Sequence, residues 1–301
     1  MHVITLPKST LMSMKQHYTH YLKANPPAHS LFCAVYQGTT ITAYTSGKVL
    51  FQGKQADQEA ALWQEALQKN AQSTTSLPPH FHSLSVIGSD EVGTGSYFGS
   101  LVVCSAFVPS HQLEDLKKLG VQDSKKLTDT RIQQLAKLLK ERIPYHIIDV
   151  LPEKYNDVQP TMSQGQMKAE LHNHALIHLL KKIAPQKPDA ILIDQFEQPS
   201  TYYRHIQHKP IQIKENVYFA TKGESHHLAV AAASIIARAT FLDTLNTLSQ
   251  QAGCLLPSGA NSTVDEVAAQ LIHHYGIEVL HKFAKYHFAN TQKAIHLETR
   301  L

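Results

Sequence analysis

The chain has 301 residues, of which 43% are hydrophobic, and its 28 basic and 24 acidic side chains leave a net charge of +4. These values exclude a disordered chain and leave room for two domains with real cores. Three cysteines without disulfide or zinc spacing, Cys33, Cys104 and Cys254, indicate an intracellular protein with reduced thiols. The N-terminus has no signal-peptide core and the longest apolar run, 228–237, is short for a membrane span, so we expect a soluble, cytoplasmic protein.

The positive charge is concentrated at the start of the chain. Residues 1–82 contain six of the basic residues and only three of the acids, whereas the remainder is nearly balanced. A basic surface suits a polyanionic partner. An ordinary solvated surface would explain the same charge, so the charge alone does not identify a partner.

The first domain is predicted to be a small α+β unit. We expect a strand at 2–6, helices at about 9–23 and 55–71, and three strands at 31–36, 40–45 and 48–52. Two helices on one face of the sheet would leave the other face to bind nucleic acid or to pack on the second domain. The polar segment 73–80, with its proline pair, is the clearest linker, so the predicted domains are 1–80 and 81–301.

The second domain is predicted to be a mixed α/β sheet covered by helices. A chain that begins with consecutive strands and continues with strands that alternate with helices is typical of that architecture. The expected strands lie just before Asp90 and at 101–108, 145–151, 190–194 and 217–220, and the expected helices lie at 129–142, 164–183 and 225–249.

Acidic residues stand at the ends of two of these apolar strands. Asp90 and Glu91 follow the first strand, and Asp194 ends the strand 190–194. A buried acid is costly unless a cation meets it, and ligand sites collect at the carboxyl edge of open α/β sheets. Each acid also has a simpler explanation, because Asp and Glu occur in turns and as strand-end caps.

Glu224 is the fourth acid of interest, since it precedes the apolar helix that contains LAVAAASIIARA. An acid at a helix N-terminus is favoured by the helix dipole, which would explain this residue without a functional role. Four carboxylates at one sheet edge would repel one another by roughly 4 kcal/mol per close pair at 4 Å. A set with no His or Cys suits two Mg²⁺ or Mn²⁺ ions, which can activate a water and stabilise the leaving oxygen of a phosphodiester.

Four motifs together resemble the type 2 ribonuclease H family, and most closely its ribonuclease HIII branch. They are DEVGTGSYFG at 90–99, DSKKL at 123–127, LIDQF at 192–196, and TKGES followed by AVAAASIIAR up to Arg238. The resemblance covers nearly the whole chain. It implies a ribonuclease H-like second domain and an N-terminal domain similar to half of the TATA-binding protein.

The resemblance also implies that Asp90, Glu91, Asp194 and Glu224 bind the metal ions of a Mg²⁺-dependent nuclease that cuts the RNA strand of an RNA–DNA hybrid. Two positions depart from the family pattern: Ser100 stands where Pro is usual, which would loosen the loop, and Ser258 stands where Lys is expected, which would remove a phosphate contact. Neither departure touches the four acids.

The glycine loop at 93–99 leads into a strand and has the spacing GxGxxxG, so it is not a dinucleotide fingerprint. We expect the backbone of its first residues to approach the sugar, where a 2′-hydroxyl distinguishes RNA from DNA. Lys125 is a candidate contact to a backbone phosphate, or a solvated loop charge. The predicted substrate-binding residues are Gly93, Thr94, Gly95, Ser96 and Lys125.

The main hypothesis is therefore a monomeric endonuclease that acts on RNA–DNA hybrids through two metal ions, without an organic cofactor, and leaves 3′-hydroxyl and 5′-phosphate ends. A ribonuclease HII-like junction endonuclease and a binding protein without activity are the alternatives. The C-terminal segment 281–294 mixes basic and aromatic residues. A packed helix with one solvated face is the simpler explanation of that segment.

Overall fold

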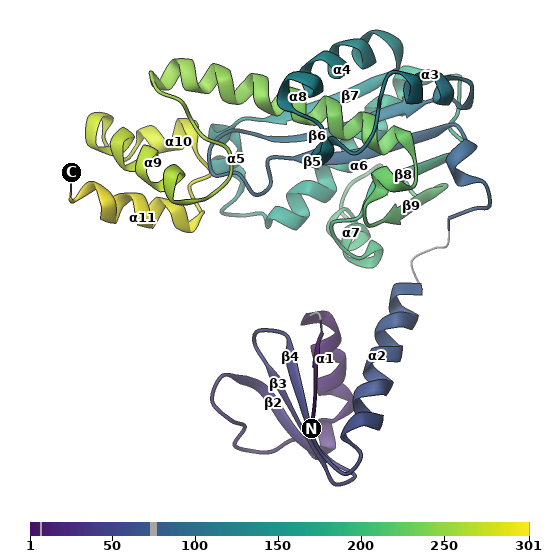
Figure 1. Cartoon of the computed structure of the whole chain (residues 1–301), viewed down its shortest axis with the longest axis vertical. Coiled ribbons are helices and arrows are strands. Elements are labelled where there is room, and N and C mark those ends of the chain that lie inside the picture. Colours follow the sequence, from purple (N-terminus) through teal and green to yellow (C-terminus); the bar gives the residue numbers. More distant parts are fainter. Residues whose placement is uncertain (7, 73–76, 301) are drawn as a thin grey trace. The chain divides into compact units, whose positions relative to one another are not determined.

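The computed structural model describes residues 1–6, 8–72 and 77–300. The chain divides into two compact units, Met1–Ser76 and Leu77–Leu301, which we describe separately (Figure 1). Of the expected linker 73–80, the first four residues lie outside the described residues. The roles assigned to the two expected domains stay predictions at this point.

The first unit is an antiparallel sheet of four strands in the order β1-β4-β3-β2 with two helices on one face. Alternate strand residues such as Ile41, Ala43, Val49 and Phe51 face those helices and form the core, because side chains of a strand alternate between the two faces. The elements are β1 (His2–Thr5), α1 (Lys8–His17), β2 (Ser30–Tyr36), β3 (Thr39–Tyr44), β4 (Lys48–Gly53) and α2 (Ala56–Gln72).

The other face of this sheet carries no helix within the described part of the unit. Val3 and Val35 point to that side and are 51% and 40% exposed. Val3 lies opposite Leu50, Leu50 lies opposite Thr42, and Thr42 lies opposite Cys33, two residues before Val35. These side chains therefore share one face. The open face expected from the sequence is therefore present.

The expected helix at 9–23 was too long. It ends at His17 and is followed by a short 3₁₀ turn, Thr19–Tyr21. Tyr18 is fully buried and donates a hydrogen bond of 2.7 Å to Glu59 in α2. The chain then runs beside β2, where Leu22 pairs with Ala34. These contacts hold residues 18–22 in a conformation that does not continue the helix.

The second unit has a five-stranded sheet in the order β7-β6-β5-β8-β9, which confirms the predicted mixed α/β fold. Strand β5 is antiparallel to β6 and parallel to β8. The strands are β5 (Val86–Val92), β6 (Leu101–Val108), β7 (Tyr145–Val150), β8 (Ala190–Asp194) and β9 (Val217–Ala220).

Helices cover both faces of this second sheet. Helix α8 packs on one face together with α4, and α6 packs on the other face together with α7 (Figure 1). Every residue of β6 is consequently buried. The helices are α3 (Leu113–Lys118), α4 (Asp129–Arg142), α5 (Pro152–Val158), α6 (Gln164–Ile183), α7 (Pro199–His205), α8 (Leu228–Ala252), α9 (Ser262–Tyr275), α10 (Val279–Phe283) and α11 (Ala289–Glu298).

Two expected helices have different bounds. The long helix predicted from residue 225 begins instead at Leu228, and Glu224 lies before it in the 3₁₀ turn Gly223–Ser225. The segment 281–294 is not one helix but the end of α10, a break, and the start of α11. The break contains Lys285, which is fully buried.

Among the described helices, α8 is the one whose length and apolar composition, with a mean hydropathy of 1.6, match those of a membrane span. Inside the protein, however, 67% of that window is buried. At Gly88 of β5 an added Cβ would lie 2.2 Å from the backbone of Ala229, so the helix packs directly against the strand. Its apolar character is explained by this position in the core.

Candidate active site at the edge of the second sheet

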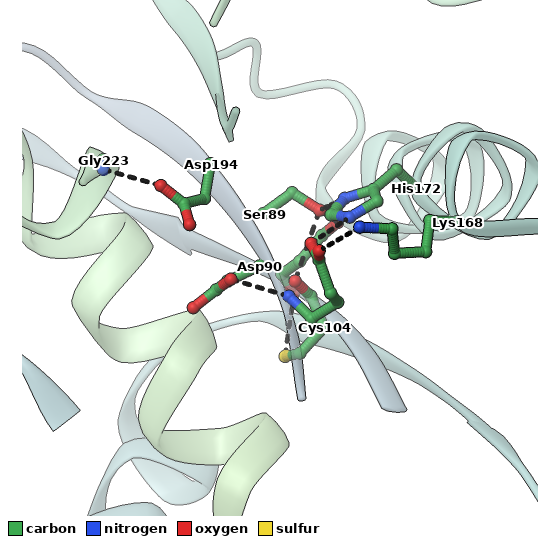
Figure 2. A network of polar contacts seen from close by, with 9 residues as sticks. Ser89, Asp90, Cys104, Lys168, His172, Asp194 and Gly223 are labelled. Carbon is green, nitrogen blue, oxygen red and sulfur yellow. Dashed lines mark hydrogen bonds and ion pairs between the residues drawn. The ribbon is translucent and has the colours of Figure 1, made fainter. Parts of the chain in front are cut away.

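Asp90 and Asp194 come together because β5 and β8 are adjacent and parallel. Ser89 pairs with Ile193 in the register of these strands, so the next residue of each strand is an acid at the same edge. Figure 2 shows both side chains at this edge. Asp194 ends β8 as predicted, whereas Asp90 lies within β5, which pairs with β6 as far as Val92. The two acids lie side by side.

Asp90 occupies an environment that opposes its negative charge. The side chain is buried, and burial, together with the charges of Glu91 and Asp194, raises its pKa to about 8. A hydrogen bond of 2.7 Å from the Glu91 backbone N–H to Asp90 Oδ1 opposes that shift only in part. A cation at this point would remove the electrostatic cost.

Glu91 is stabilised in its charged form by two side chains of α6. Burial raises the pKa of Glu91, but the hydrogen bond and charge of His172 and the charge of Lys168 lower it below its ordinary value. Lys168 Nζ donates to one carboxylate oxygen at 2.9 Å, and His172 Nε2 lies 3.0 Å from the other. Adjacent acids in one strand thus have opposite shifts in pKa.

The support for Glu91 continues into the core. His172 Nδ1 lies 2.7 Å from Ser89 Oγ, which in turn lies 2.9 Å from Ser105 Oγ (Figure 2). Lys168 also lies 4.1 Å from the centre of the Phe196 ring, a cation–π contact. These buried contacts hold the Glu91 carboxylate in one orientation.

Asp194 is held by the turn that contains Glu224. The Gly223 backbone N–H donates to Asp194 Oδ1 at 2.8 Å. Burial is the main cause that raises the pKa of Asp194, and the charges of Glu224 and Glu91 add to it, while the charge of Lys125 opposes it. The four predicted acids therefore influence one another, and Lys125 is near enough to act on the same group.

The donor set fits a hard divalent cation by its chemistry, because the side chains are carboxylates and two of them have raised pKa values. Within the described ranges, however, no three His, Cys, Asp or Glu side chains lie together as a ready-made metal centre. Glu91 also shares its oxygens with Lys168 and His172. Metal binding by all four acids thus stays a prediction.

The glycine loop lies directly after these acids. Gly93 has a φ of +93°, and an added Cβ would lie 2.2 Å from the Ser100 carbonyl oxygen, so this position requires glycine. Gly95 is exposed with open space around it. Of the other predicted contact residues, Thr94 is half-buried, Lys125 is exposed and Ser96 is buried.

Ser96 has a structural role that the sequence did not reveal. Its hydroxyl donates to the Phe98 carbonyl at 2.9 Å and accepts from the Gly259 N–H at 3.0 Å. Ser258, next to Gly259, is exposed beside this loop. Ser100 is fully buried, and its hydroxyl is without a hydrogen-bond partner.

Three basic residues near the site were missed by the sequence analysis: Lys168, His172 and Lys285. The spacing of Lys168 and His172 places both on one face of α6, four residues apart. A basic pair on a helix is usually solvated, so this signal alone would not have identified them. Lys285 was missed because its segment looked like a continuous amphipathic helix.

Comparisons with known proteins agree with this architecture. The family model described as Ribonuclease HII matches residues 87–291, and one described as a domain of unknown function, DUF3378, matches residues 1–76. The first match defines the protein as a ribonuclease H enzyme.

Relatives identify the branch. A ribonuclease HIII of Enterococcus faecalis is 48% identical over 297 residues, 97% of each chain. One of Bacillus anthracis is 48% identical over 304 residues, 98% of each chain. The crystal structure of Bst-RNase HIII in complex with Mn²⁺ has a TM-score of 0.74 and 43% identity, with 99% of each chain covered. The chain belongs to the ribonuclease HIII family, which confirms the resemblance seen in the sequence.

Proposed function

We propose that the protein is an endonuclease that hydrolyses the RNA strand of RNA–DNA hybrids with two divalent metal ions, leaving 3′-hydroxyl and 5′-phosphate ends. The observation that carries the proposal is the pair Asp90 and Asp194 at one edge of β5 and β8, with the pKa of Asp90 raised to about 8. A protein gains nothing for its fold from a buried acid, Asp90, beside a half-buried acid, Asp194, that repels it. Such a pair is expected where a cation binds.

The chain supplies the ligands and their orientation. Asp90, Glu91, Asp194 and Glu224 would hold the ions, with Asp194 fixed by the Gly223 N–H and Glu91 fixed by Lys168 and His172. Bound divalent cations supply activation of a water and stabilisation of the leaving oxygen. Either Mg²⁺ or Mn²⁺ suits an all-oxygen set, and the similar Bst-RNase HIII was crystallised with Mn²⁺.

The neighbouring groups suit a nucleic-acid strand. Exposed Lys125 lies close enough to Asp194 to lower its pKa, so it is placed to contact a phosphate beside the reacting one. Gly93, Thr94 and Gly95 form the accessible half of the loop that follows the acids, where the backbone can approach a ribose. The first unit, with its open sheet face, is proposed to bind the hybrid duplex.

The test is cleavage of a labelled RNA–DNA hybrid by the full chain in Mg²⁺, in Mn²⁺ and in EDTA. We expect internal cuts in the RNA strand with either cation and none in EDTA. Ligation or phosphatase treatment of the products identifies the ends. Binding of the hybrid without cleavage in both metals would show that the chain is a binding protein instead.

A further inference from the structure

Lys285 lies in the break between α10 and α11, and its side chain is fully buried. Its Nζ donates to the carbonyl oxygens of Ser96 at 2.8 Å and Gly99 at 2.7 Å, and its backbone N–H donates to the Tyr97 carbonyl at 2.8 Å. All three acceptors belong to the glycine loop. One lysine from the far end of the chain thus makes three hydrogen bonds to the segment that follows the acids.

Neighbouring residues of the same C-terminal segment extend this contact. The Gly99 N–H donates to the Phe283 carbonyl at 3.1 Å, and Phe98 pairs with Ala284 as an isolated β-bridge. The Tyr97 hydroxyl lies 2.9 Å from Thr291 Oγ1 in α11. The second half of the loop, Ser96–Gly99, is therefore paired along its length with residues 283–291.

Burying a lysine in order to satisfy two carbonyl groups costs free energy of desolvation. Burial lowers the pKa of Lys285 to about 7, and the charge of Asp149 opposes that shift. Strand-like pairing with residues 283 and 284 alone would have joined the segments without any ionisable group. The lysine adds a connection that backbone pairing does not make, because it joins the two ends of Ser96–Gly99 through one atom.

The bond from Lys285 to Ser96 also fixes the accessible half of the loop, residues 93–95. Gly95 is exposed, and it directly precedes Ser96, whose carbonyl Lys285 binds. The position of residues 93–95 next to Asp90 and Glu91 thus depends on where Ser96 is held. If Ser96 moved, the backbone groups offered to a ribose would move with it.

We propose that Lys285 is a positioning residue for substrate recognition, which holds the glycine loop in the conformation that accepts a ribonucleotide strand. The inference rests on the proposed function for the identity of the substrate, but the positioning itself is a property of the chain without substrate. Lys285 takes no part in the chemical step.

The first experiment measures the loop directly. In Lys285→Met the side chain keeps its approximate length but loses its donors, and we expect amides of 96–99 to exchange with deuterium roughly tenfold faster, the effect of losing about one charged hydrogen bond. Amides of β5 and β6 should keep the wild-type rate. Lys293→Met, which changes an exposed lysine of α11, is the matched control and should exchange as wild type. Unchanged exchange at 96–99 in Lys285→Met overturns the proposal.

The second experiment separates recognition from chemistry. For hybrid cleavage by Lys285→Met we expect KM to rise about tenfold while kcat changes less than about threefold. A fall in kcat with an unchanged KM would contradict a positioning role. If the wild type fails to cut hybrids, the proposed function is wrong, whereas the exchange experiment still decides whether Lys285 positions the loop.

If Lys285→Met does not fold, Lys285→Gln provides the same test. Its side chain is shorter and uncharged, so the bonds to the Ser96 and Gly99 carbonyls are weakened while a polar donor is kept. We expect a smaller increase in exchange at 96–99 and a smaller rise in KM, in the same direction. Wild-type values for both would overturn the inference.

Discussion

The two sheets of this protein expose their residues in opposite ways. In the second unit helices cover both faces, so that all of β6 is buried and the acids Asp90 and Asp194 lie together at one edge. In the first unit the helices cover one face, and Val3 and Val35 remain exposed on the other. A sheet covered on both sides offers a small site at its edge, whereas a sheet covered on one side offers a broad surface. The first arrangement suits chemistry on one bond, and the second suits contact with an extended partner.

The strongest test of the edge site is removal of one acid. Asp90→Asn and Asp194→Asn should each lower the rate of hybrid cleavage in Mg²⁺ by more than about a hundredfold, because a lost ligand costs more than a lost supporting contact. Single-turnover cleavage at saturating hybrid measures this effect. Asn at an exposed acid of the same unit, Asp115→Asn, is the matched control and should retain activity.

The stability of the Asp90→Asn variant shows whether Asp90 is functional or structural. With its pKa raised to about 8, folded Asp90 binds a proton that the unfolded chain has lost above about pH 4. Metal-free wild type should therefore lose stability as the pH rises from about 4 to 8. Asp90→Asn should be more stable than wild type in EDTA at pH 8, with the difference shrinking at pH 5. An unfolded Asp90→Asn protein would make this acid structural.

The open face of the first unit gives the second prediction. Replacing Val3 and Val35 by Asp places two negative charges on that face, and we expect hybrid affinity to fall by roughly tenfold or more while kcat at saturating hybrid changes little. Deleting residues 1–76 should weaken binding further and flatten its salt dependence, since six lysines leave with the unit. Binding measured by anisotropy at several salt concentrations tests both variants. Unchanged hybrid affinity in both variants would mean that this face does not bind the hybrid.

The sequence was sufficient for the parts of the site that follow from local pattern. An apolar run that ends in an acid predicted the positions of Asp90 and Asp194, because consecutive residues determine whether a strand is buried and in which direction it runs. It was insufficient where a contact joins distant segments. Lys285 meets Ser96 across 189 positions, and nothing in its neighbours marks it as buried. The helix after Glu224 was expected to begin at residue 225 instead of Leu228, because the turn Gly223–Ser225 is joined to Asp194 by a hydrogen bond from a distant strand.

A third prediction concerns the number of consecutive ribonucleotides in the substrate. Thr94 is the middle residue of Gly93-Thr94-Gly95, and its hydroxyl cannot make the forked contacts that a guanidinium would make to a phosphate. If affinity depends instead on the broad face of the first unit, a hybrid with four or more ribonucleotides should be cut at several positions. A single ribonucleotide in duplex DNA should be cut roughly tenfold or more slowly in Mg²⁺. Equal rates on both substrates would place the protein functionally with the HII branch.

The smallest effect is expected at His227, which supports the covered sheet from the start of α8. His227 Nδ1 accepts the Ala229 N–H at 3.0 Å, and Nε2 lies 3.1 Å from the Leu84 carbonyl, to which it donates. Burial is the main cause that lowers its pKa to about 4, with the charge of His82 adding to it and the bond to Leu84 opposing it. Between about pH 4 and 6.5 the unfolded chain binds a proton that the folded chain does not, so stability is lost as the pH falls through this window.

His227→Gln keeps a donor and an acceptor but does not titrate. Wild type should therefore lose about 1–3 kcal/mol more of its free energy of unfolding than His227→Gln between pH 7 and pH 4.5. Urea unfolding followed by circular dichroism at each pH measures the difference. His226→Gln, at the exposed neighbouring position, should follow the wild type because its side chain lies in solvent. Parallel pH profiles for wild type and His227→Gln would mean that protonation of His227, which replaces the Nδ1 acceptor of Ala229 by a donor, does not cost the folded protein stability.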